Sequence, residues 1–203
     1  MQRLVLLMAF ALAANAQVIE FESSGLKYKA LTRGGITIMI ATLHTHIRSW
    51  AVLQVAVSNG SPVSWGVRPE DFHFKRDDGK DLQAMPARTV VGELLDKAGR
   101  GDVIKLITAY EAALNSNAQM HSTNGYESRR QSAQAELGSS KLKAAAAASA
   151  IAFVSTKLLP GQSTDGAVFY ANQGKPLGSG QLIVNTAGET FVFPMEADPH
   201  ASH

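Results

Sequence analysis

Two histidines, His44 and His46, form the most closely spaced pair of potential metal ligands in the chain. Residues two apart in an extended strand project from the same face, which is a geometry that can hold a metal ion. A complete site needs further ligands from elsewhere in the sequence, and the candidates are His73, His121 and Asp71. The other interpretation is a polar strand end. We favour the strand end, predict no bound cofactor, and keep a metal-binding protein or metal-dependent enzyme as the competing hypothesis.

The residue patterns of hydrolytic enzymes are missing from the sequence. It contains no cysteine nucleophile, no Gly-x-Ser-x-Gly turn and no His-Glu-x-x-His helix. Glu70 and Asp71 are adjacent acids, but neighbours in a strand point to opposite faces and cannot share a substrate proton. We therefore expect Asp71 to brace the turn before Phe72. The lack of these patterns favours a protein without catalytic activity.

The elements that would position such residues begin with β-strands. From Leu26 to Phe74 the apolar residues recur with period two, which is typical of strands that bury one face. Two strands carry the clearest pattern, and their predicted buried residues are Ile36, Ile38 and Ile40 in one and Leu53, Val55 and Val57 in the other. The second strand is expected from about Trp50 to Ser58, because the turn residues Asn59-Gly60-Ser61-Pro62 follow it.

Turn residues predict two hairpins and one further strand. Asp78-Gly79 is typical of a type I′ hairpin loop, and its return strand would run from Leu82 to Met85. Later in the chain, a turn at Leu159-Pro160-Gly161 precedes a strand from Ala167 to Ala171. The last hairpin is expected to pair residues 182–185 with 191–193 across 186–189.

Between these two sets of strands, residues 90–152 lose the strand period and form a predicted helical insertion. We expect a helical turn at 93–97, a helix from Asp102, and another from Ser140 that reaches Phe153. The second of these carries an apolar stripe that would meet either the strands or a partner: Val103, Leu106, Ile107, Tyr110 and Leu114. The chain thus divides into residues 17–89 and 153–195 as two parts of one β-sandwich, the insertion between them, and a disordered tail at 196–203.

Turn and core residues occur in two separate stretches of the sequence. The first is Trp50 to Met85, with Asn59, Asp71-Phe72 and Asp78-Gly79. The second is Leu159-Pro160-Gly161, followed by Gly166 and Phe169. Together they resemble a family of immunoglobulin-like β-sandwich domains found in bacterial exported proteins and lipoproteins, of unassigned function. The resemblance implies an antiparallel immunoglobulin-like sandwich and no functional residues. The chain departs from the family pattern because it has no cysteine for lipid attachment and carries the insertion.

The N-terminal residues are typical of a secretory signal peptide. Arg3 precedes an apolar run from Leu4 to about Ala13, and the small residues Ala14-Asn15-Ala16 follow. We expect cleavage before Gln17 and a mature protein in the periplasm or outside the cell. The run is shorter than the roughly 20 apolar residues that a spanning helix needs. No stable membrane anchor is therefore expected.

Charge and composition narrow the choice of partner. The formal net charge is +2, and no segment gathers enough lysine and arginine to follow a phosphate backbone, so nucleic acid is not expected. Without cysteine the fold cannot rely on disulfides, which implies a core of sufficient size. The sequence predicts a non-catalytic binding or envelope-structural module. The remaining alternative is an accessory of an envelope or secretion assembly that contacts an envelope protein through the insertion; the oligomeric state is left open.

Overall fold

The computed structural model describes residues 17–23, 26–97, 101, 147–148 and 151–197. Within these residues the apolar alternation produces strands, and every pairing between named strands is antiparallel. The described part of the chain also contains one 3-10 helix, η1 (Pro69–Asp71), and one longer α-helix, α1 (Ala87–Lys97). The protein is therefore mostly β with antiparallel sheets, as the alternating pattern predicts.

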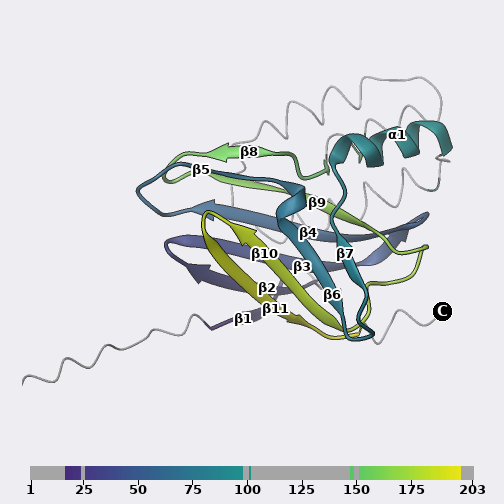
Figure 1. The fold of residues 1–203 in the computed structure, drawn as a ribbon, viewed down its shortest axis with the longest axis horizontal. Coiled ribbons are helices and arrows are strands. Elements are labelled where there is room, and N and C mark those ends of the chain that lie inside the picture. The colour runs from purple at the N-terminus through teal and green to yellow at the C-terminus, as the bar shows by residue number, and fades with distance from the viewer. Residues whose placement is uncertain (1–16, 24–25, 98–100, 102–146, 149–150, 198–203) are drawn as a thin grey trace, which may run out of the picture.

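The strands form three sheets (Figure 1). The largest has the order β1 (Ile19–Ser23), β2 (Leu26–Arg33), β3 (Ile36–Ile47), β4 (Trp50–Asn59), β9 (Ser163–Ala171). The second has the order β11 (Glu189–Met195), β10 (Gly180–Thr186), β6 (Phe72–Arg76), β7 (Asp81–Gln83). The third is a short ribbon of β5 (Trp65–Val67) and β8 (Thr156–Leu158). Each sheet therefore combines strands from residues 17–97 with strands from residues 151–197.

The two larger sheets pack face to face around one apolar core. The predicted faces are confirmed: Ile38 in β3 and Val55 in β4 belong to this core, together with Phe74 of β6 and Phe193 of β11. Each of these side chains is at most 1% exposed. Aromatic rings fill the interior, where Phe74 and Tyr170 meet edge to face at 6.3 Å between ring centroids. Burial of this apolar surface is the main force that holds the two layers together.

A second apolar cluster covers the outer face of the five-stranded sheet. Val90 and Leu94 of α1, both fully buried, pack there with Ile151 and with Phe169 of β9. The connection into α1 is tied down as well, because the Met85 amide donates to the Phe169 carbonyl oxygen at 2.8 Å. Figure 1 shows α1 lying across this side of the sheet. The helix is thus part of the packed fold.

The structure corrects the predicted type of the hairpin turn at Asp78-Gly79. A type I′ loop needs positive φ at both central residues, yet at this hairpin only Gly79 has it, at 86°. The Gly79 amide donates to the Arg76 carbonyl oxygen, and the Arg76 amide donates to that of Lys80. This is a three-residue loop with Gly79 in the left-handed region. Two-residue loops with positive φ at both positions occur instead between β2 and β3, at Gly34 (φ 54°) and Gly35 (φ 78°), and between β10 and β11, at Ala187 (φ 51°) and Gly188 (φ 77°).

Three further differences concern the bounds of elements. Helix α1 begins at Ala87, six residues earlier than the predicted helical turn at 93–97. Phe153 is not helical: it packs edge to face on Phe72 in the main core, at 5.4 Å between centroids. Its amide donates to the Ala167 carbonyl oxygen of β9, so the chain has already left the helix there. The short strands β1, β5 and β8 were not predicted, because three to five residues give too little periodicity.

Candidate binding groove

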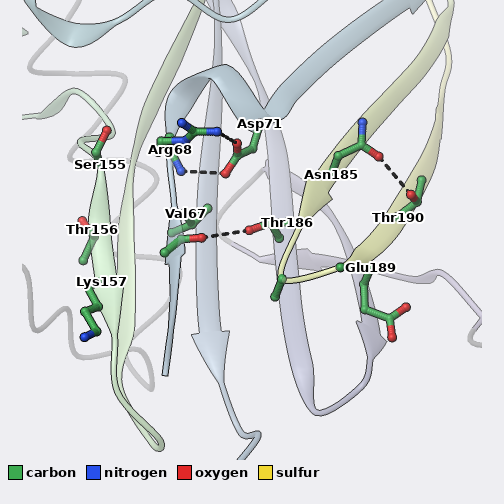
Figure 2. A pocket seen from close by; sticks show the side chains of 13 residues that line it. Val67, Arg68, Asp71, Ser155, Thr156, Lys157, Asn185, Thr186, Glu189 and Thr190 are labelled. Carbon is green, nitrogen blue, oxygen red and sulfur yellow. Dashed lines mark hydrogen bonds and ion pairs between the residues drawn. The ribbon is translucent and has the colours of Figure 1, made fainter. Parts of the chain in front are cut away.

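An open groove of about 710 Å³ lies between the β5–β8 ribbon and the turn that joins β10 to β11 (Figure 2). Three segments line it, and nearly all of their side chains are polar or absent: residues 66–68 with Asp71, residues 155–157, and residues 185–190. Its volume falls within the range of about 300–1,000 Å³ that is typical of ligand sites. Such sites combine apolar surface with a few well-placed polar groups, and here the polar groups include the charged side chains of Arg68, Asp71, Lys157 and Glu189.

The β5–β8 ribbon has one face toward the core and one toward the groove. Val67 and Leu158 are fully buried and belong to the main core. Side chains alternate along a strand, so the intervening Gly66 and its cross-strand partner Lys157 occupy the other face. Arg68 continues β5 with extended backbone (φ −134°, ψ 156°) and therefore shares that face. Burial of Val67 and Leu158 thus presents Arg68 and Lys157 to the groove.

Gly66 leaves the floor of the groove without a side chain. Its φ lies outside the left-handed region, so other residues can adopt its backbone conformation. A Cβ placed there would have one neighbouring atom, the Thr156 carbonyl oxygen at 3.9 Å. No close approach therefore requires glycine at this position. A larger side chain at position 66 would extend into the groove.

Strand β8 is held in place by a buried asparagine, Asn59, which is 0% exposed. Its amide nitrogen donates to the carbonyl oxygens of Val63, at 2.8 Å, and Leu158, at 3.1 Å. Its side-chain oxygen accepts bonds from the amide and the hydroxyl of Ser61. The Gly161 amide donates to the Asn59 carbonyl oxygen at 2.6 Å. We call these contacts the Asn59 junction; they bring together the two stretches that carry the family resemblance.

Helix η1 positions the charged pair at one end of the groove. Asp71 Oδ2 accepts a bond from the Arg68 amide at 2.9 Å, and Oδ1 lies 3.2 Å from the Arg68 guanidinium. The expectation that Asp71 braces the turn before Phe72 is confirmed. Asp71 is nearly buried, with a side chain 10% exposed, whereas Arg68 is 66% exposed. The guanidinium therefore keeps donors that face solvent and the groove.

The opposite wall is the turn of the last hairpin, and a hydrogen bond fixes it to β5. The Thr186 hydroxyl donates to the Gly66 carbonyl oxygen at 3.2 Å (Figure 2). Beside it, the Thr190 hydroxyl donates to Asn185 Oδ1 at 2.9 Å. Because its oxygen is occupied, the Asn185 side chain offers its amide nitrogen to a ligand. The wall therefore presents a donor to the groove.

The predicted histidine pair lies in β3, where the strand is irregular. Its pairing with β4 shifts register between Thr42 and His46, so the regular alternation that underlies a same-face prediction is interrupted. The side chains of His44 and His46 lie outside what the structure describes. Of the other candidate ligands, Asp71 is engaged by Arg68, His73 belongs to the other large sheet, and His121 is outside the described residues. Among the described residues, no group of three potential ligands could hold a metal ion.

The predicted partner-binding stripe, Val103, Leu106, Ile107, Tyr110 and Leu114, lies outside the described residues. Conversely, the sequence reasoning missed Gly66, Arg68 and Lys157. A weak signal existed in Trp65-Gly66-Val67, where two apolar residues flank a glycine in a strand pattern. Nothing in the sequence indicated that this segment would meet residues 155–157 or 185–190.

No helix in the described residues has the length and apolar character that crossing a membrane requires. Comparison with known proteins does not name the site either. No family model, no curated protein and no solved structure matches the chain. The geometry of the groove is therefore the basis for assigning a function.

Proposed function

We propose that the protein is an exported, non-catalytic binding module with an immunoglobulin-like sandwich, and that its ligand occupies the groove beside β5 and β8. Export follows from the signal-peptide pattern of residues 1–16. Two antiparallel sheets around one core support the sandwich. The Asn59 junction supports its immunoglobulin-like character, because it joins the two stretches on which the resemblance is based.

The observation that carries the binding role is hydrogen-bonding capacity that the fold does not use. Lys157 is exposed and has no ion pair with any described residue, and Asn185 presents its amide nitrogen. The buried polar side chain of Asn59 differs from these groove residues, because its nitrogen and its oxygen both bond within the protein. Donors grouped in a concave site without internal partners are typical of ligand recognition.

Nuclear magnetic resonance on the ¹⁵N-labelled mature protein tests this proposal. Soluble fractions of an envelope extract are titrated into the wild type and into two variants, Gly66→Leu and Gly66→Ala. We expect shifts at amides of residues 66–71, 155–157 and 185–190. Gly66→Leu should abolish the shifts because its side chain fills the floor, whereas the smaller Gly66→Ala should retain most of the response. Shifts confined to other surfaces, or shifts that survive in Gly66→Leu, would overturn the assignment of the groove.

A further inference from the structure

On the side of the groove that carries Arg68, Lys157 and Asn185, the hydrogen-bonding groups left to a ligand are mostly donors. Both oxygens of Asp71 already accept bonds from Arg68, and Asn185 Oδ1 accepts one from Thr190. The Thr156 hydroxyl donates to the Val154 carbonyl oxygen. The side-chain capacity that remains near Lys157, Arg68 and Asn185 is thus mainly that of their donors, and the Glu189 carboxylate, which also lines the groove, lies apart from them. A complementary ligand must be rich in acceptors.

The charges favour an anionic group within that ligand. Asp71 balances one of the two cations, Arg68, at 3.2 Å. Glu189 lines the groove but extends toward Gly34 in the β2–β3 turn. Its Oε1 would lie 3.1 Å from the Cβ atom of a side chain at that position. Figure 2 shows this carboxylate pointing away from Arg68 and Lys157. Lys157 is therefore left without a counter-ion among the described residues.

Arg68 and Lys157 can reach the same carboxylate when the flexible Lys157 side chain, which points away from Arg68 in Figure 2, turns toward it. Lys157 pairs with Gly66, so Arg68 is its diagonal neighbour on one face of the ribbon. Diagonal neighbours lie about 7–8 Å apart, which long side chains can span. The guanidinium and the ammonium group would then donate charge-assisted hydrogen bonds to the carboxylate oxygens from two sides.

The rest of the groove fits a peptide better than an isolated ion or an apolar compound. A volume of about 710 Å³ far exceeds the size of one carboxylate or phosphate group. The hydroxyl of Ser155 and the amide of Asn185 complement the backbone carbonyl and N–H groups of a peptide. Two cations are also too few for a polyanion, whose binding needs many charge contacts.

We infer that the groove binds an extended acidic peptide segment, with one of its carboxylates held between Lys157 and Arg68. This inference depends on the proposed binding role of the groove and adds the class of ligand. Charge attraction between the partners should make binding weaken with added salt.

Fluorescence anisotropy with a defined probe tests the inference. The probe is a fluorescein-labelled hexapeptide of alternating aspartate and serine, matched by a peptide in which asparagine replaces aspartate. The mature wild type should bind the acidic peptide at least about tenfold more tightly. Lys157→Gln should weaken this binding about tenfold. Lys80→Gln, the same charge change at an exposed position in the β6–β7 turn, should leave it unchanged, and circular dichroism should show all variants folded.

The outcomes separate the ligand class from the site. Equal binding of both peptides, or equal loss in Lys157→Gln and Lys80→Gln, overturns the acidic-peptide inference. Displacement of the probe by inorganic phosphate or by glucuronate oligosaccharides as strongly as by unlabelled acidic peptide also overturns it. A third outcome is that no peptide binds, but an extract fraction shifts the groove amides of the wild type and not those of Gly66→Leu. In that case the groove remains the binding site and only the ligand class is wrong. If neither experiment responds, both proposals fail.

Discussion

The Asn59 junction and the groove share strand β8, yet they use polar groups in opposite ways. At the junction, the buried Asn59 side chain bonds both the β4–β5 loop and Leu158, and no described atom of this side chain lacks a partner. In the groove, one residue away on the same strand, Lys157 is exposed and has no partner among the described residues. Internally bonded groups stabilise the fold, whereas the unbonded donors are available to a ligand.

The largest expected effect comes from breaking the junction. Asn59→Leu removes two donated and two accepted bonds, so that the buried Ser61 amide and the buried Leu158 carbonyl oxygen each lose this partner. Each buried group without a partner costs about 1–3 kcal/mol, so we expect a loss of about 3 kcal/mol in the free energy of unfolding. Urea denaturation of the wild type and variant measures it. A loss below about 1 kcal/mol would show that the junction does not hold β8.

Tyr170 is also a buried polar residue, but unlike Asn59 its side chain is not bonded: the hydroxyl has no hydrogen-bond partner among the described residues. Tyr170→Phe removes this unsatisfied group and should raise the free energy of unfolding by about 1 kcal/mol at neutral pH. Urea denaturation again provides the measurement. A destabilisation as large as that of Asn59→Leu would mean that the hydroxyl is bonded in the folded protein.

The same residue predicts a dependence on alkaline pH. Burial raises the pKa of the Tyr170 hydroxyl far above its ordinary value of 10.0. Above that value the unfolded chain loses this proton and the folded protein keeps it, so stability falls as pH rises, by about 1.4 kcal/mol per pH unit from this group. Melting curves between neutral and strongly alkaline pH should decline more steeply for the wild type than for Tyr170→Phe. Parallel curves would contradict the prediction.

A smaller effect is expected where the hairpin meets β5. Thr186→Val keeps the side-chain shape but removes the bond from the buried Thr186 hydroxyl to the Gly66 carbonyl oxygen. One such bond contributes about 1 kcal/mol to stability. We expect that loss in urea denaturation, together with weaker binding of the groove ligand, because the two walls are no longer fixed relative to each other. Unchanged stability would indicate that water replaces the bond at no cost.

The smallest effects on stability should come from the groove itself. Lys157→Gln and Gly66→Ala change the side chain at exposed positions where that side chain bonds no described residue, and such substitutions usually alter stability by less than about 0.5 kcal/mol. Their melting temperatures should therefore match that of the wild type, while Lys157→Gln loses affinity. If Lys157→Gln were clearly less stable than the wild type, Lys157 would stabilise the fold, as Asn59 does, and would not be reserved for a ligand.

The sequence predicted well those elements whose pattern is local and repeated. Ile36, Ile38 and Ile40 alternate over a long strand, and burial of one strand face removes all three from water. The last hairpin was predicted for the same reason, with its turn residues between two alternating runs. The Asp78-Gly79 turn was located correctly but its type was not, because loop length rather than the dipeptide decided which residue takes positive φ.

The sequence by itself therefore determined the mostly-β character, the antiparallel strands and the brace between Asp71 and its turn. Only the tertiary structure decided which segments meet. Residues 66–68, 155–157 and 185–190 lie far apart in sequence and converge because Val67 and Leu158 are buried in the same core and Thr186 bonds to Gly66. Local periodicity records which face of a strand is buried, but it holds no information on the partner strand. A groove formed between three such segments is a property of their packing, and no single segment specifies it.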